Sequence, residues 1–163
     1  MKIKVEKDFL PQDDFNKLKN KVLGSNFFYS SFVAGVGAHN DGYYFTHTLF
    51  EDFKIRSDLF DLIIPILDKI KAKALHRAKI NLYPQTHKII EHDQHQDTKF
   101  KCKSFILSLN TCNGYTRIGK DTIIPSIENQ GLFFEGYKLH NSTTCSDQHV
   151  RFNINDLHLN FVS

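Results

Sequence analysis

The sequence contains no tryptophan, only three cysteines and no long apolar run. The cysteines, Cys102, Cys112 and Cys145, are odd in number and lack CxxC spacing, so neither a disulfide framework nor a zinc ribbon is supported. The richest apolar stretch, residues 59–67, is interrupted by an aspartate and a proline, and it is far shorter than the roughly 20 residues of a membrane-spanning helix. Residues 1–10 alternate charged and apolar side chains and show no secretory signal. We therefore expect a soluble, cytoplasmic protein that does not insert into a membrane.

The chain also has little excess charge. Its 21 basic and 18 acidic residues leave a net charge of +3, and no block of lysine and arginine forms a basic patch, so nucleic acid is not an expected partner. Hydrophobic residues make up 40% and charged residues 24%, which are near globular averages and exclude wholesale disorder. The 163 residues suit one domain spanning 1–163, and a domain of this size buries about 70% of its unfolded surface.

Two helical regions are expected in the first half of the chain. Over residues 11–24, Phe15, Leu18 and Val22 recur on one helical face, and a glycine stops the pattern. A second helical region covers residues 57–75, where Pro65 should kink it or split it in two.

Elsewhere the sequence favours short β-strands separated by turn residues. The β-prone segments are 1–5, 27–36, 43–50, 77–83, 100–110, 115–118, 122–125, 131–135 and 150–162. Their number and order predict an α+β, mainly β fold, in which a jelly-roll or barrel core carries N-terminal helices packed on one sheet. The 15 phenylalanines suit such a sheet-rich interior.

Nine histidines make a metal site the first chemistry to consider. Non-haem Fe(II) oxygenases hold the metal with two imidazoles and one carboxylate, and a His-x-Asp pair fits because residues two apart in a strand point the same way. Two such pairs occur. His39 and Asp41 lie in a glycine-flanked turn, where Asn-Asp-Gly is ordinary turn chemistry. His95 and Asp97 precede the β-rich half.

A third ligand for the second pair is His140. It follows Asp97 by 43 residues, which is room for roughly four or five short strands, the path of a chain around a jelly roll. Arg151 lies eleven residues further on, and the chain has only four arginines. An inward-pointing arginine can hold a dicarboxylate through paired charge-assisted hydrogen bonds. Arg151, Asn153 and Asn155 alternate on one strand face, which indicates a ligand in the barrel interior.

Together these residues resemble the 2-oxoglutarate/Fe(II)-dependent oxygenases, specifically the small prolyl-4-hydroxylase-like branch of phages and marine bacteria. The resemblance covers most of the chain, and it depends on the order of its motifs. These are Phe9-Leu10-Pro11, Tyr44-Phe45-Thr46-His47, Asn81-Leu82-Tyr83-Pro84, His95-x-Asp97, Leu109-Asn110-Thr111, Asn113-Gly114-Tyr115-Thr116, Glu128-Asn129-Gln130, Phe133-Phe134-Glu135-Gly136, His140 and Arg151-Phe152-Asn153-Ile154-Asn155.

The resemblance implies a double-stranded β-helix and a set of site residues. Fe(II) would be held by its three ligands, and 2-oxoglutarate would chelate the iron beside O₂. The implied metal ligands are His95, Asp97 and His140. The implied co-substrate residues are Arg151, which would bind the distal carboxylate, with Tyr83 and Asn155 nearby. The gap from Tyr83 to His95 is longer than in typical prolyl 4-hydroxylases.

Two further residues are weaker candidates for contact with the substrate. His92 stands where the family often has a tyrosine, and we expect it in a solvent-facing loop or at the substrate entrance. Tyr115 lies in the turn motif after the His-x-Asp pair. The resemblance implies a hydroxylase of an unidentified small molecule, amino acid or peptidyl proline. The alternatives are a cupin-like, non-enzymatic module that binds a small anion through Arg151, and a metal-free jelly roll. The sequence does not indicate an oligomeric state.

Overall fold

The computed structural model describes residues 3–34 and 42–159. The pair His39 and Asp41 lies outside the described residues. Eleven strands and three helical segments are present in the described part of the chain. The strands are β1 (Lys4–Glu6), β2 (Phe28–Ser30), β3 (Tyr44–Glu51), β4 (Lys54–Ile55), β5 (Ala74–Pro84), β6 (Lys103–Ser108), β7 (Cys112–Ile118), β8 (Thr122–Ser126), β9 (Gln130–Glu135), β10 (His140–Ser142) and β11 (Val150–Leu159). The helices are α1 (Gln12–Leu23), the 3₁₀ helix η1 (Asp58–Ile63) and α2 (Ile64–Ile70).

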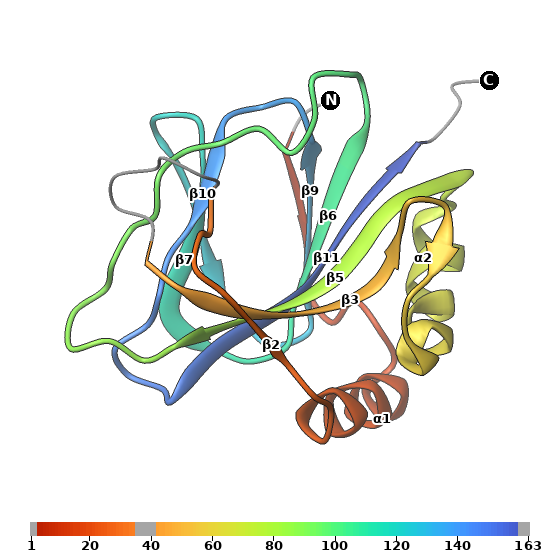
Figure 1. The fold of residues 1–163 in the computed structure, drawn as a ribbon, viewed down its shortest axis with the longest axis horizontal. Coiled ribbons are helices and arrows are strands. Elements are labelled where there is room, and N and C mark those ends of the chain that lie inside the picture. Colours follow the sequence, from red (N-terminus) through yellow and green to blue (C-terminus); the bar gives the residue numbers. More distant parts are fainter. Residues whose placement is uncertain (1–2, 35–41, 160–163) are drawn as a thin grey trace.

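The strands form two antiparallel sheets. The large sheet has the order β1-β9-β6-β11-β5-β3-β2, with β4 paired to β3, and the small sheet has the order β10-β7-β8. In Figure 1 the small sheet faces the inner side of the large one, while α1 and α2 cover the outer side of the large sheet. The predicted fold class, a jelly-roll core with helices packed on one sheet, is therefore confirmed. Within the described ranges, no helix is both long and apolar enough to span a bilayer.

The helices lie where the sequence patterns placed them, with one boundary corrected. Residues 57–75 divide at Pro65, which occupies the first turn of α2, where its missing N–H is harmless. The predicted end at residue 75 is wrong, because Lys71 adopts a left-handed conformation (φ 55°) that ends α2. The long strand β5 already begins at Ala74.

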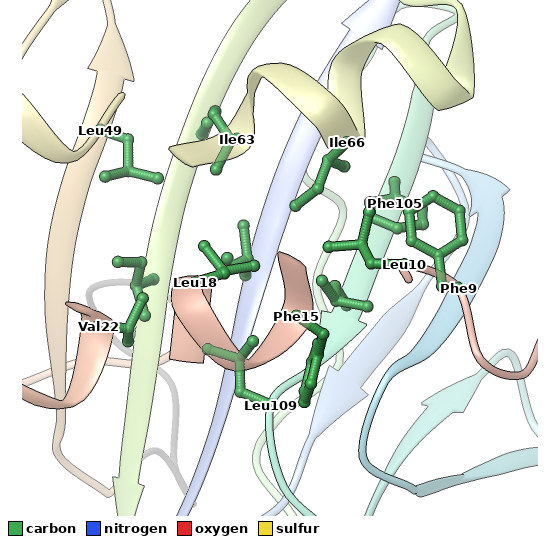
Figure 2. Close-up of a cluster of buried hydrophobic side chains, with 14 of the residues drawn as sticks. Phe9, Leu10, Phe15, Leu18, Val22, Leu49, Ile63, Ile66, Phe105 and Leu109 are labelled. Atoms are coloured by element: carbon green, nitrogen blue, oxygen red, sulfur yellow. The ribbon is translucent and has the colours of Figure 1, made fainter. Parts of the chain in front are cut away.

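The hydrophobic core lies between the helices and the outer face of the large sheet. Figure 2 shows Phe15, Leu18 and Val22 of α1 directed at the side chains of η1, α2 and the strands. All three are buried, and burying each such side chain contributes about 1.5–3 kcal/mol. On the opposite, inner face of the sheet, Arg151 and Asn153 alternate with core residues along β11, whereas β6 and β9 contribute apolar side chains. The polar part of the inner face is therefore formed by β11 and its neighbour β5.

Candidate metal centre

The three predicted ligands lie close together beside β10, the edge strand of the small sheet. The backbones of His95 and His140 exchange two hydrogen bonds of 2.9 Å each, which places the loop before β6 beside β10. The Asp97 N–H donates to the carbonyl of Gly136, which fixes the third side chain. One potential ligand atom from each of His95, Asp97 and His140 lies within 4.8 Å of the other two. This spacing suits a single bound metal ion.

The imidazole of His140 is fixed in the orientation that a metal ligand needs. Its Nδ1 donates to the carbonyl of Lys138 at 2.8 Å, so the neutral ring carries its proton there and Nε2 has a free lone pair. Nε2 lies 3.2 Å from Oδ2 of Asp97, and the ring packs edge-on against Phe134. Two buried acceptors this close require a proton or a cation between them.

Asp97 is held as a carboxylate despite its burial. Burial alone would raise the pKa of the Asp97 carboxyl, but its hydrogen bond with His140 and the charges of His140 and Arg77 outweigh this and lower the pKa below its usual range. Arg77 donates to Oδ1 at 2.8 Å, and Ser104 donates to Oδ2 at 3.3 Å. Burial also lowers the pKa of His95, which favours the neutral imidazole that binds metals. The donor set therefore fits a divalent cation such as Fe(II).

Arg151 lies in the interior, opposite Tyr83 in the pairing of β11 with β5. Its side chain is 1% exposed, and it donates to the Thr143 carbonyl at 3.1 Å and to the Thr116 hydroxyl at 2.9 Å. Its Nε has no hydrogen-bond partner, and no ion pair joins Arg151 to a carboxylate among the described residues. Because an unpaired buried charge is costly, this guanidinium fits an anionic ligand such as the carboxylate of 2-oxoglutarate.

A pocket joins the three candidate ligands to the inner face of the large sheet. The pocket is partly open to solvent, and Tyr83, Asn155 and Lys79 contribute to its wall. Arg151 does not line this pocket, although Thr116 and Tyr83, which contact it, do. Burial raises the pKa of the Tyr83 hydroxyl to about 12, so it remains a hydrogen-bond donor at neutral pH.

The structure corrects the expected position of His92. The side chain is 3% exposed, its Nδ1 lies 3.0 Å from the Ser142 hydroxyl, and its ring packs on Tyr83 at 5.4 Å between centroids. The expectation of a solvent-facing loop is wrong, because residues 91–95 run alongside β10 and the backbone N–H of His92 donates to the Ser142 carbonyl. His92 is not among the three clustered donors.

Tyr115 lies on β7, away from the pocket wall. Its hydroxyl donates to Glu91 at 2.7 Å, and Arg117 donates to both oxygens of the same carboxylate. The geometry gives no support to contact between Tyr115 and substrate, so that role stays a prediction. Its observed partners tie β7 to the segment that leads to His95.

The sequence analysis missed the polar residues that β5 supplies to the site. Arg77, Lys79 and Asn81 alternate with core residues, as the three polar residues of β11 do, and they pair across the two strands with Leu157, Asn155 and Asn153. Asn81 donates to Asn153 at 3.1 Å. The sequence signal for these residues is the two-residue alternation of β5, which places them on the same strand face as Tyr83.

Comparison with known proteins finds structures of similar fold but no related sequence family. No family model matches the sequence, and no curated protein is similar to it in sequence. Several solved structures are similar in fold. The crystal structure of a Pseudomonas putida prolyl-4-hydroxylase is 13% identical with a TM-score of 0.66, and the match covers 96% of this chain and 91% of that chain.

Two other solved structures with a similar fold are an oxidoreductase and an epimerase. An oxidoreductase of the 2OG-Fe(II) oxygenase family from Burkholderia pseudomallei is 12% identical with a TM-score of 0.62, covering 90% of this chain and 77% of that chain. The non-heme alpha ketoglutarate dependent epimerase SnoN from nogalamycin biosynthesis is 10% identical with a TM-score of 0.67, covering 97% and 77%. This chain therefore has the double-stranded β-helix fold of 2-oxoglutarate/Fe(II) oxygenase structures. At these identities the likeness concerns the fold alone.

Proposed function

We propose that this protein is an Fe(II)- and 2-oxoglutarate-dependent dioxygenase that hydroxylates a small-molecule or peptide substrate. The observation that carries the proposal is the convergence of His95, Asp97 and His140 at one end of a pocket within this fold. The buried, ion-pair-free guanidinium of Arg151 further along the same inner face adds a second, independent feature. A dioxygenase of this class needs both a three-ligand metal site and an anchor for a dicarboxylate.

The chain's own residues would prepare the metal site in three ways. The Lys138 carbonyl keeps the proton on Nδ1 of His140, so that Nε2 can act as the ligand atom. Arg77 and Ser104 hold the Asp97 carboxylate by hydrogen bonds, and the charge of Arg77 favours its ionised form. Bound Fe(II) would supply the O₂ activation that couples decarboxylation of 2-oxoglutarate, to succinate and CO₂, with hydroxylation of the substrate.

The co-substrate would lie between the candidate metal ligands and Arg151. Arg151 would bind its distal carboxylate, since the guanidinium has an unpaired Nε–H and no carboxylate partner among the described side chains. Tyr83 packs against this guanidinium and, being protonated, would donate a hydrogen bond to the same carboxylate. Asn155 lines the same pocket as Tyr83 and the three candidate metal ligands.

The finer assignment, to the small prolyl-4-hydroxylase-like branch, also belongs to this proposal. It is supported by the order of the sequence motifs and by the similarity in fold to the Pseudomonas putida prolyl-4-hydroxylase. Because the epimerase SnoN has a similar fold, the fold alone does not select hydroxylation, and the outcome of the oxidation remains part of this proposal.

The test is oxygen-dependent consumption of 2-oxoglutarate. Purified protein would be given Fe(II), ¹³C-labelled 2-oxoglutarate and ¹⁸O₂ together with a metabolite and peptide library. We expect succinate and CO₂ in equal amounts, with ¹⁸O appearing in one library component. Asp97→Ala, which removes a ligand, should produce neither. Binding of 2-oxoglutarate without consumption by the wild type would contradict the proposal and favour a cupin-like anion-binding module.

A further inference from the structure

We propose that Lys79 and Tyr44 bind a carboxylate of the primary substrate, and that this substrate is a small free acid with a hydrogen-bond donor near its carboxylate, such as an α-amino acid. This inference names the substrate class of the dioxygenase proposed above and rests on that function. It assigns Lys79 a role in substrate specificity, separate from metal binding and from the anchor at Arg151.

Lys79 lies in the middle of β5 and lines the pocket together with His95 and Asp97. Its ammonium group donates to the hydroxyl of Tyr44 at 3.1 Å, and Tyr44 is itself buried and stacked on Tyr83 at 5.5 Å between ring centroids. The tyrosine therefore fixes the position of the ammonium group without neutralising it. Both groups can donate a hydrogen bond to an anion in the pocket.

The charge of Lys79 has no counter-ion in the part of the chain that the structure describes. Arg77, two residues earlier on the same face of β5, pairs with Asp97, whereas Lys79 forms no ion pair with a carboxylate. A half-buried ammonium group facing a pocket without a carboxylate partner favours an anionic ligand. The same reasoning applies to Arg151, which lies behind the pocket wall at Thr116 and Tyr83, so the interior of the fold has two separate cationic positions.

Binding of 2-oxoglutarate alone would leave Lys79 without an anionic partner. Under the proposed function, one carboxylate of 2-oxoglutarate would bind at the metal site and the other would pair with Arg151. Both negative charges of the co-substrate would then have partners other than Lys79. A divalent metal held by a single carboxylate ligand adds no negative charge, and Arg77 makes the region still more positive. We therefore infer that Lys79 is available for an anionic group of the primary substrate.

Two buried amide oxygens indicate what else this substrate carries. Asn155, which pairs with Lys79 across the strands, and Asn81 both line the pocket. The side-chain oxygen of each is buried and has no hydrogen-bond partner among the described residues. At neutral pH, 2-oxoglutarate has only acceptor oxygens, so it cannot satisfy these groups. An ammonium or hydroxyl group beside the substrate carboxylate can donate to them.

The experiment compares free acids with their amides. Zn(II)-loaded protein with 2-oxoglutarate would be mixed with free L-amino acids and the matching carboxamides, and binding would be measured by saturation-transfer NMR. We expect transfer to one or more acids at least tenfold stronger than to the matching amides. Lys79→Met should abolish this preference, Lys79→Arg should restore part of it, and the exposed Lys73→Met should leave it unchanged. Equal binding of acids and amides, or an unchanged preference in Lys79→Met, would overturn the proposal.

A second measurement separates this proposal from the function on which it rests. Calorimetric titration of 2-oxoglutarate into the metal-loaded protein should give Kd values within about twofold for the wild type and Lys79→Met. A tenfold weakening in Lys79→Met would make Lys79 a co-substrate anchor and overturn the inference, while the dioxygenase proposal would stand. Failure of the wild type to bind 2-oxoglutarate would instead overturn the dioxygenase proposal and, with it, the assignment of a primary substrate.

Discussion

The Nε2 atom of His140 lies 3.2 Å from the Oδ2 atom of Asp97, and both side chains are 4% exposed. Because the other ring nitrogen of His140 must donate to the Lys138 carbonyl, this contact brings together two groups that are acceptors in the neutral ring and the carboxylate. Without a metal, a second proton on the ring can satisfy the contact. A divalent cation bound with His95 would also satisfy it, and this is why we propose that the cluster binds a metal.

Replacement of His140 tests this assignment directly. His140→Ala removes one of three ligand groups, and we expect the affinity for Fe(II) or Ni(II), measured by calorimetry, to fall at least 100-fold. The matched control is His92→Ala, because His92 is equally buried but lies outside the cluster of donors. His92→Ala should keep the metal affinity within about threefold. Equal losses in the two variants would show that the cluster has been misassigned.

Arg151→Lys tests the co-substrate anchor. The lysine keeps a positive charge but loses the planar fork, which donates to Thr143 and Thr116 and leaves Nε for a ligand. Charge-assisted hydrogen bonds contribute roughly 1.5–3 kcal/mol each, so we expect about 10- to 150-fold weaker binding of 2-oxoglutarate to the Mn(II) protein. Metal affinity should barely change. A parallel loss of metal binding would mean that Arg151 is purely structural.

Gly114→Ala tests whether the packing around Arg151 is needed. A Cβ atom at this position would lie 2.6 Å from Cδ of Arg151 and 2.7 Å from the carbonyl oxygen of Thr144, which is backbone and cannot easily move. We expect a loss of about 1–3 kcal/mol in unfolding free energy, measured in urea, because overpacking forces side chains and backbone to shift. Binding of 2-oxoglutarate should weaken as well.

Gly42→Ala provides the comparison for this substitution. Apart from its chain neighbours, no described residue places an atom within 4 Å of a Cβ built at Gly42, so the unfolding free energy should change by less than about 0.5 kcal/mol. A Gly114→Ala protein as stable as Gly42→Ala, with unchanged co-substrate binding, would refute the packing argument.

The lowered pKa of Glu91 predicts that this residue contributes to the free energy of unfolding in a pH-dependent way. Hydrogen bonds from Arg117, with further bonds from Tyr115 and Asn141, lower the pKa of Glu91 to about 2. A carboxyl whose pKa is lower in the folded state stabilises that state above its unfolded pKa, and this contribution disappears as the pH falls through the folded value. Glu91→Gln should therefore be less stable than wild type at pH 7, and urea unfolding should show the difference shrinking between pH 4.5 and pH 2. A difference independent of pH would contradict the assignment.

Sequence patterns predicted those features that depend on local periodicity. The buried face of α1, including Phe15 and Leu18, follows from the 3.6-residue period. The alternation of Arg151 and Asn153 with core residues on β11 follows from the two-residue period of a strand. The proximity of His140 to the His-x-Asp pair follows from counting strands between them.

Features that depend on pairing between distant segments were not predictable in this way. The burial of His92 results from the hydrogen bonds of residues 91–95 to β10, which no local pattern in the loop indicates. Lys79 lies in a segment predicted as a strand, but its face could be assigned only once β5 was paired with β11. The three-residue strand β10 is too short to show a period of its own.

The central claim is that the metal ligands and Arg151 serve one ligand, and calorimetric titration of 2-oxoglutarate without oxygen tests it most directly. The titration would be made with metal-free, Mn(II)-loaded and Mn(II)-treated Asp97→Ala protein. A ligand held at both ends should bind the Mn(II)-loaded wild type at least tenfold more tightly than either of the other two. Equal affinities in all three samples would show that Arg151 binds an anion independently of His95, Asp97 and His140, and would contradict the account.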